Sequence, residues 1–358
     1  MVNVQPEQWF LFDIPPPGFD PETASGQELE KYGIIPRPPD SSDLFDNWRR
    51  LFKAPVTFVD PRPEPLVPPP QSPNAVAPPA RPANKVRALS EPGPGPDVSP
   101  ALPAGAGSRL SHSSNWSGGY IVPTNNTMVV QVAAAWRLPT LSEPSDESNP
   151  PIGSLYCCST WVGLDGQRLY LNSSLPQVGV MQWLQPSLSP PELAPTAFCQ
   201  WWYRQGNGLP LSLPGLPVAA GDFVIASVWA KTAKTAICYL RNVTTSRIAV
   251  VGMKAPWLTP QDELSISGAT AEWILERPTI PGETGLYPFP DYHMTEFAAW
   301  AAVARDAGPP QAPLDLRTAR GIAMYDTQDN PARTAFISMP YRKGSAAIKL
   351  EYGGFEPK

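Results

Sequence analysis

Histidine is scarce in this 358-residue sequence, and its scarcity excludes several kinds of active site. Only His112 and His293 occur, and neither has the spacing of a zinc-ligand motif. A Ser-His-Asp or Cys-His triad would have two candidate bases, but no nucleophile motif surrounds either of them. We therefore expect no metal site, and any hydrolytic chemistry must depend on carboxylates.

Cysteine, positive charge and long apolar runs are also in short supply. The four cysteines (Cys157, Cys158, Cys199 and Cys238) form no Cys-x-x-Cys motif, so we expect free buried thiols rather than a disulfide framework. A net charge of −5 and a pI near 5.2 give no basic surface for nucleic acid. No apolar run reaches the roughly 18 residues of a membrane helix, so we expect no membrane partner.

Proline, in contrast, is abundant and unevenly spread. Of 49 prolines, 24 precede Ser108, and residues 60–108 are rich in proline, alanine and glycine. Such a composition cannot bury enough apolar surface to fold, so we expect an extended, largely disordered linker there. Residues 1–59 contain one short amphipathic helix, capped by Ser41 or Ser42, and resemble a prosegment. Its apolar stripe consists of Leu44, Phe45, Trp48, Leu51 and Phe52. The helix is too short to be stable alone, so we expect it to dock on the domain that follows.

Residues 109–358 read as short alternating strands separated by turns. Strands without intervening helices predict an all-β fold, an antiparallel two-sheet β-sandwich of concanavalin-like or jelly-roll type. One short helix is expected near Glu296–Arg305. The expected strands are Met128–Trp136, Ser159–Leu164, Gln177–Leu184, Phe198–Arg204, Asp222–Lys231, Ala236–Arg241, Arg247–Val251, Ala271–Arg277, Thr334–Met339 and Ala346–Tyr352.

Two carboxylates share one face of the strand Ala271-Glu272-Trp273-Ile274-Leu275-Glu276. Strand alternation sends Trp273 and Leu275 to the core and leaves Glu272 and Glu276 on the opposite, accessible face. Apolar neighbours should raise the pKa of these carboxyls toward the range of a general acid or base.

Two further segments carry candidate functional residues. Trp161, Gly163 and Asp165 fall on one strand face, where Gly163 would let a ligand approach and Asp165-Gly166 marks a turn. Gln177, near the start of another strand, has a neutral amide that can donate a hydrogen bond to an oxyanion.

Together these segments resemble the glutamic peptidase, or eqolisin, family. The blocks that carry the resemblance occur in the family's order over the C-terminal two-thirds of the chain: Asn115-Trp116-Ser117-Gly118-Gly119, Trp136-Arg137-Leu138-Pro139, Trp161 to Gly166, Gln177-Val178-Gly179-Val180, Gly221-Asp222, Asn242-Val243-Thr244-Thr245 and Ala271 to Glu276.

The resemblance implies an acid endopeptidase with a catalytic dyad of Gln177 and Glu276 and no cofactor. It places Trp161 beside the substrate and gives Asp165 a supporting role under the cleft. Gly163, Trp202 and Glu272 complete the expected substrate-binding set. Polypeptides are the expected substrates, and the chain is expected to be a monomer.

The sequence also departs from the family's pattern. Pro176 stands before Gln177 where the family usually has Leu, and the cysteines do not reproduce the fungal members' pattern. Fungal members are secreted, so secretion is the expectation here. The N-terminal residues show no secretory signal of the usual form, so a cytoplasmic location is the alternative. Residues 1–60 are hypothesised to shield the cleft until acidification or cleavage in the linker.

Two other functions compete with this interpretation. Glu272 and Glu276 have the strand spacing of some β-sandwich glycoside hydrolases, although about 13 Å of strand separates them and retaining enzymes need carboxyls roughly 5–5.5 Å apart. A non-catalytic sandwich could instead bind peptide or carbohydrate through Trp161, Trp183, Trp201 and Trp202.

Overall fold

The computed structural model describes residues 8–69, 110–124, 126–145, 155–167, 174–191, 193–203, 209–259, 262–280, 285–327, 334–344 and 346–354. In this part of the chain, 19 strands join in one hydrogen-bonded sheet, and β14 pairs with β15 separately. Nearly every pairing is antiparallel; β2 on β13 and β4 on β19 are parallel. The all-β expectation is confirmed.

The helices are α1 (Gly26–Lys31), α2 (Asp43–Phe52) and the 3-10 helix η2 (Leu316–Thr318). The strands are β1 (Trp9–Phe10), β2 (Thr57–Phe58), β3 (Glu64–Pro65), β4 (Leu110–Ser113), β5 (Trp116–Ile121), β6 (Met128–Arg137), β7 (Tyr156–Leu164), β8 (Ser174–Leu184), β9 (Thr196–Tyr203), β10 (Leu211–Ser212), β11 (Phe223–Thr232), β12 (Thr235–Asn242), β13 (Arg247–Lys254), β14 (Trp257–Thr259), β15 (Asp262–Glu263), β16 (Ala271–Glu276), β17 (Met294–Ala304), β18 (Ala312–Pro313), β19 (Arg320–Thr327), β20 (Thr334–Lys343) and β21 (Ala347–Tyr352).

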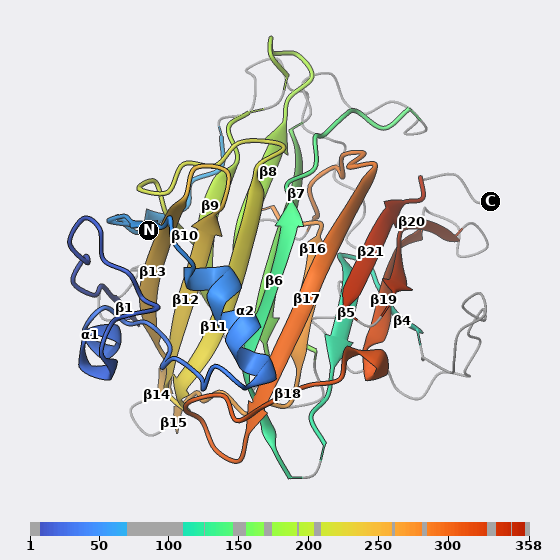
Figure 1. Cartoon of the computed structure of the whole chain (residues 1–358). Helices are drawn as coiled ribbons and strands as arrows, with labels where there is room; N and C mark the ends of the chain where they lie inside the picture. The colour runs from blue at the N-terminus through green and yellow to red at the C-terminus, as the bar shows by residue number, and fades with distance from the viewer. Residues whose placement is uncertain are drawn as a thin grey trace.

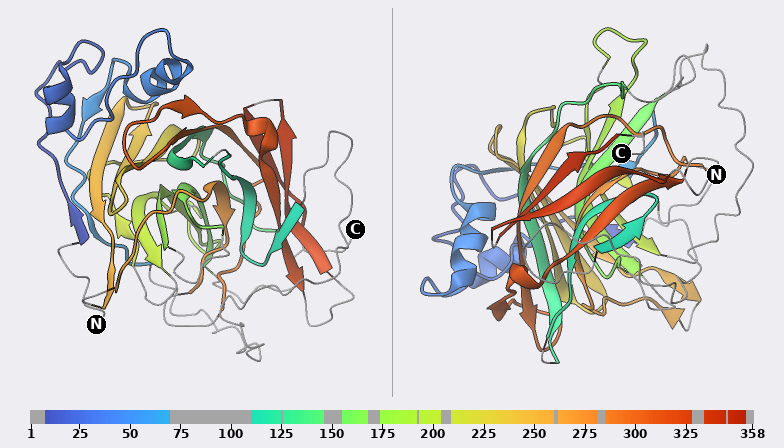
Figure 2. Two further views of the ribbon diagram at one scale, coloured as in Figure 1. Left: turned by 90° about the horizontal axis from the view of Figure 1, so that it is seen from below. Right: turned by 90° about the vertical axis from the view of Figure 1, so that its right-hand side faces the viewer.

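The sheet bends on itself and makes two facing layers (Figures 1 and 2). One layer, called the back layer here although it lies nearer the viewer in Figure 1, consists of β13, β12, β11, β6, β17 and β21 in order of pairing. The front layer consists of β5, β16, β7, β8 and β9. β20 and β19 connect the two layers at one side. The sandwich is therefore one continuous sheet rather than two separate ones.

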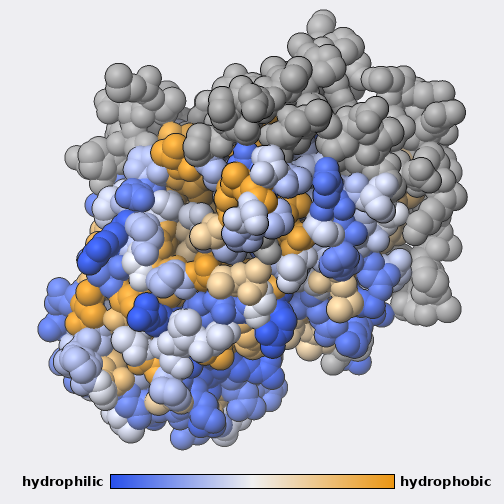
Figure 3. Space-filling view, turned by 90° about the horizontal axis from the view of Figure 1, so that it is seen from above, coloured by the Kyte–Doolittle hydropathy of each residue, from blue (hydrophilic) through white to orange (hydrophobic). Residues whose placement is uncertain are grey.

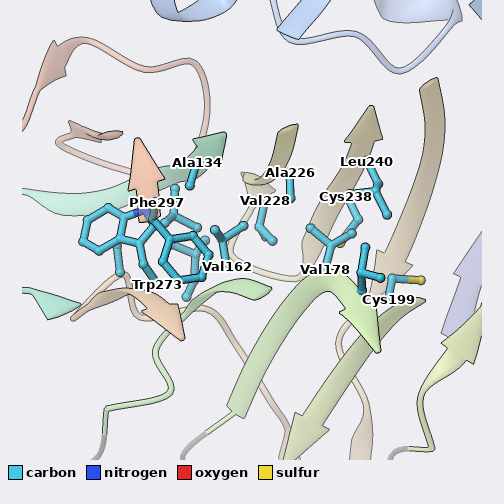
Figure 4. Close-up of a cluster of buried hydrophobic side chains, with 14 of the residues drawn as sticks. Ala134, Val162, Val178, Cys199, Ala226, Val228, Cys238, Leu240, Trp273 and Phe297 are labelled. Carbon is cyan, nitrogen blue, oxygen red and sulfur yellow. The ribbon is translucent and has the colours of Figure 1, made fainter. Parts of the chain in front are cut away.

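The main core lies between the layers. Alternate residues of the back layer, such as Ala226 and Val228, meet alternate residues of the front layer, such as Val178 and Trp273 (Figure 4). The indole of Trp273 crosses the core and donates to the carbonyl of Ala133, at 2.8 Å. All four cysteines are buried and free, as expected.

One expected element is wrong. The segment near Glu296–Arg305 is strand β17 and not a helix. Phe297, Ala299, Ala301 and Val303 enter the main core, while Trp300 faces the other side of the sheet. The alanine-rich sequence has high helix propensity, but pairing with β6 and β21 overrides it.

The N-terminal segment packs on the outer face of the back layer. Ser42 caps α2 as expected, accepting from the backbone NH of Leu44. The buried stripe of α2 contacts side chains of the back layer, on the side away from the front layer (Figure 2). The described residues 8–60 therefore lie on the side away from the candidate residues, which is contrary to the hypothesis that this region shields them.

Of the expected linker 60–108, only residues 60–69 lie within the described part of the chain. They include β3, which pairs with β10 at the edge of the front layer. The expected domain boundaries at 59 and 108 remain predictions. Among the described residues no helix is both long and apolar enough to span a membrane. Their exposed surface mixes apolar residues among hydrophilic ones (Figure 3).

Candidate active site

The candidate residues lie on the outer face of the front layer. Trp161, Leu175, Met181, Trp183 and Ile274 form a buried aromatic and aliphatic cluster on this face. Glu272, Glu276 and Gln177 occupy positions of the same alternation, so their side chains also belong to this face.

Glu276 is the last residue of β16 and stays half-buried. Its Oε2 accepts from the indole Nε1 of Trp161 at 2.8 Å, and its Oε1 accepts from Nδ2 of Asn115 at 3.4 Å. The ring of Trp116 stands edge-on to Trp161, with centroids 5.1 Å apart. Burial raises the pKa of Glu276 to about 7, although the hydrogen bonds from Trp161 and Asn115 act in the opposite direction.

Glu272 differs from the expectation that both carboxylates are accessible. It has no exposed surface, and its Oε1 accepts from the backbone NH of Gln167 at 2.9 Å. Burial raises the pKa of Glu272 to about 8, against the hydrogen bond from Gln167, which lowers it. Strand alternation placed this side chain on the correct face, but it could not show that neighbouring chain encloses it.

Gln177 is buried on β8, beside Gln200 of β9. Its Nε2 donates to Oε1 of Gln200 at 2.7 Å. Because an amide nitrogen carries two hydrogens, this bond orients the group and leaves a second N–H free to donate elsewhere.

The strand register shows which candidates share a row. Glu272, Gly163, Gln177 and Gln200 lie side by side across β16, β7, β8 and β9. Glu276 lies on the row of Ser159 and Met181, four residues further along β16. The structure therefore puts Gln177 on the row of Glu272, and the row of Trp161 lies between the rows of Gln177 and Glu276.

Gly163 does not leave an open space on this face. A Cβ added there would meet Leu175 at 2.5 Å and the indole of Trp161 at 3.1 Å. This glycine therefore permits close side-chain packing over the strand and not the approach of a ligand.

Asp165 ends β7 in a left-handed turn with φ of 67°. Its buried carboxylate accepts from the backbone NH groups of Ser267, Gly268 and Ala269, at 2.5, 3.2 and 2.7 Å, and from the Ser267 hydroxyl at 3.0 Å. Burial raises the pKa of Asp165 despite these bonds. Its contacts hold the loop before β16.

Trp202 is partly buried and packs against the aromatic cluster on this face, whereas Trp201 turns into the main core. Trp183 is buried within the cluster. The four tryptophans expected to line one groove are therefore divided between two faces of the front layer.

Sequence reasoning gave no role to three residues that hold the candidates. Asn115 contacts Glu276, and its backbone carbonyl accepts from the NH of Arg277 at 2.8 Å. Arg277 pairs with Asp326 at 3.2 Å and donates from Nε to the carbonyl of Tyr287 at 2.7 Å, which fixes the chain just after Glu276. Gln200 orients Gln177. Asn115 belongs to one of the sequence blocks that carry the family resemblance, whereas no sequence pattern indicated a role for Gln200.

In the described residues, no three His, Cys, Asp or Glu side chains cluster as metal ligands. The donors available here are an amide, two indoles and carboxyls of raised pKa. Such a set can bind and polarise a carbonyl and move a proton.

Comparison with solved structures returns peptidases of low sequence identity. A scytalido-glutamic peptidase with a peptide-based transition state analog is 16% identical, with a TM-score of 0.48, and covers 67% of this chain and 98% of its own. SCP-B, a member of the eqolisin family in complex with the tripeptide Ala-Ile-His, is 17% identical, with a TM-score of 0.46 and the same coverage. Aspergilloglutamic peptidase from Aspergillus niger is 20% identical, with a TM-score of 0.41, and covers 55% of this chain and 99% of its own.

No curated protein matches the sequence. The model of the Peptidase A4 family, that of the eqolisins, matches residues 114–345. This span takes in every catalytic and substrate-binding candidate and most of the chain. The chain therefore belongs to the Peptidase A4 family and is a glutamic-type peptide hydrolase.

Proposed function

We propose that the chain is an acid endopeptidase in which Glu276 activates water and Gln177 stabilises the oxyanion. Ionised Glu276 takes a proton from water, and the resulting hydroxide attacks the scissile carbonyl carbon. The free N–H of Gln177 donates to the oxygen that gains charge. As the C–N bond breaks, protonated Glu276 returns its proton to the leaving amine nitrogen.

The observation that carries this proposal is the environment of Glu276. It is the half-buried carboxylate of the pair, and indole and amide donors hold both of its oxygens. Glu272 is enclosed and bound to backbone. The register favours Glu272 as the neighbour of Gln177, so the two carboxylates must be compared directly.

Glu276→Gln and Glu272→Gln form the matched pair for that comparison, because both replace a carboxyl by an amide on the same strand face. With denatured casein as substrate, we expect Glu276→Gln to abolish cleavage. Glu272→Gln should retain most of it at acid pH, since an amide resembles the protonated carboxyl already present there. The reverse pattern would assign the proton-transfer role to Glu272.

Gln177→Ala tests the oxyanion donor. Loss of one such donor typically lowers turnover on the order of a hundred- to a thousand-fold. Cleavage that is unchanged in this variant would exclude the role.

The raised pKa of Glu276 makes the pH profile informative. With a pKa of about 7, the carboxyl of the free enzyme is mostly protonated in acid. Activity in acid therefore requires that bound substrate lowers this pKa, or that protonated Glu276 acts first as a proton donor to the carbonyl. kcat/KM reports the free enzyme and kcat the complex. If bound substrate lowers the pKa of Glu276, the acid limb of the kcat profile should lie at lower pH than the acid limb of the kcat/KM profile. If protonated Glu276 acts first as a proton donor, both rates should instead fall as Glu276 ionises.

We also propose that polypeptides bind along the outer face of the front layer, beside Trp116 and Trp202. Both are partly buried and pack against the cluster that surrounds Trp161. Aromatic faces of this kind bind apolar side chains. We further propose that the protein is secreted and that it is a monomer. Secretion would be tested by locating the protein in the culture medium or in the cells.

A further inference from the structure

Residues 8–69 lie outside the family match, yet they are built into the sandwich. Six of their apolar side chains have 3% or less of their surface exposed: Leu29, Ile34, Ile35, Trp48, Leu51 and Phe52. They pack on the outer face of the back layer, against residues that include Ile237, Tyr239 and Ile248. This is the burial of a domain core rather than of a loosely attached segment.

The backbone of the segment also extends the sheet at two edges. β1 pairs with β13 in antiparallel fashion and β2 pairs with it in parallel, so the edge of the back layer is covered. β3 pairs with β10 beside the front layer. Without these additions the edge strands would expose unpaired NH and carbonyl groups.

A buried arginine anchors the end of α2. Arg241 of β12 has 6% of its surface exposed. Its Nη1 donates to the carbonyls of Leu51 at 3.0 Å and Arg50 at 3.3 Å, and its Nη2 donates to that of Pro55 at 3.0 Å. A cation at the C-terminal end of a helix is favourable. If the segment left, the guanidinium would lose all three acceptors.

Two glycines leave room for the segment. A Cβ at Gly252 would meet the ring of Phe10 at 2.3 Å, and a Cβ at Gly215 would meet the carbonyl oxygen of Asp60 at 1.7 Å. The NH of Gly215 donates to the carbonyl of Pro61 at 3.2 Å. The surface of the sandwich is therefore shaped to fit this segment at the level of single atoms.

We propose that residues 8–69 are a permanent partner of the β-sandwich, and that they stay bound when the chain is severed between residues 69 and 110. The buried side chains, the added strands and the contacts of Arg241 do not depend on the covalent connection. A cut in this interval therefore gives a two-chain protein, not a released inhibitor. Leu66 of the segment packs against the aromatic cluster of the front layer, and this contact is also kept after the cut.

The test uses the full chain, with a recognition site for a sequence-specific protease placed between Pro69 and Leu110. A Glu276→Gln background prevents self-digestion. After complete cutting, we expect both fragments to elute together in size-exclusion chromatography at low micromolar concentration and to unfold in one transition. Because the readout is co-elution, it stands whether or not the proposed peptidase mechanism holds.

Gly215→Val is the variant that tests the docking geometry most directly, because the added side chain would clash with the backbone of Asp60 and not with a movable side chain. In the cut protein we expect it to raise the fraction of free segment about tenfold, the equivalent of about 1.4 kcal/mol. Gly285→Ala is the matched control, since its added methyl meets nothing closer than 3.9 Å. In the uncut chain the connection should keep the Gly215→Val segment docked.

Separation of the unmutated segment after cutting would overturn the proposal, whether the remainder stays soluble or aggregates. Equal release from Gly215→Val and Gly285→Ala would overturn the docking geometry on which it rests.

Discussion

The outer faces of the two layers are built alike but used differently. Each carries a cluster of aromatic and aliphatic side chains, around Tyr239 and Trp229 on the back layer and around Trp161 and Trp183 on the front layer. The N-terminal segment covers the back face. The front face keeps partly buried tryptophans and holds carboxyls of raised pKa. A β-sandwich with two apolar outer faces can thus cover one face with its own chain and, as we propose, use the other for substrate and catalysis.

The largest expected effect is a loss of stability where the N-terminal segment packs on the back layer. Phe52 has no exposed surface and packs edge-on against Tyr239, with centroids 5.4 Å apart. Phe52→Ala should lower the free energy of unfolding by about 3–5 kcal/mol because it leaves a cavity. Phe45→Ala, at a half-buried position of the same helix, should cost less. Denaturant unfolding measures both, and kcat/KM of the folded protein should not change. A matching loss of kcat/KM would show that the two faces are coupled.

The next prediction concerns the buried carboxyl beneath the open face. Burial raises the pKa of Glu272 from 4.5 to about 8, so the folded state favours its protonated form. Stability from this group is complete below about pH 4.5 and is lost as pH rises through about 8, a change on the order of a few kcal/mol. Glu272→Gln should flatten the dependence of unfolding free energy on pH in this window. A slope that persists in Glu272→Gln would assign it to other groups, such as Asp165 and Glu276.

A smaller effect, on turnover, is expected from the residue that orients Gln177 on the outer face of the front layer. Gln200→Leu removes the acceptor that orients Gln177, a hydrogen bond worth about 1 kcal/mol, so turnover should fall roughly fivefold with little change in stability. Gln200→Glu keeps an acceptor at the same place and should restore most of the activity. Equal loss in both variants would mean that Gln200 acts in some way other than by orienting Gln177.

The smallest effect is a shift in pH dependence. The bond from Asn115 lowers the pKa of Glu276, so Asn115→Ala should raise that pKa. A bond worth about 1 kcal/mol corresponds to less than about one pH unit. The limb of kcat/KM that reports Glu276 should therefore move upward. Ser113→Ala keeps the bond from Asn115 to Glu276 and should move the limb less. It removes a hydroxyl that donates to Oδ1 of Asn115 at 3.0 Å and accepts from the backbone NH groups of Asn115 and Trp116. A drop in rate without any shift would point to a purely structural role.

Local patterns predicted α2 and most of the long strands. Alternation placed β7, β8 and β16, and the cap and apolar stripe placed α2, because these features depend on near neighbours in the sequence. The patterns did not predict α1, β5 or β19. At β17 the prediction was wrong, because the alanine-rich composition indicated a helix. The side chains could not show that β6 and β21 would flank it and supply its hydrogen bonds.

The sequence by itself determined the fold class, the family and the shared strand face of Glu272 and Glu276, because strand alternation and ordered motifs are local properties. Only the tertiary structure decided that Glu272 is enclosed and Glu276 half-open, that Gln177 shares a row with Glu272, and that the N-terminal segment covers the back layer. Enclosure, register and docking depend on contacts between residues far apart in the sequence, such as Arg241 with Leu51, which are 190 positions apart. No local pattern in the chain encodes such contacts.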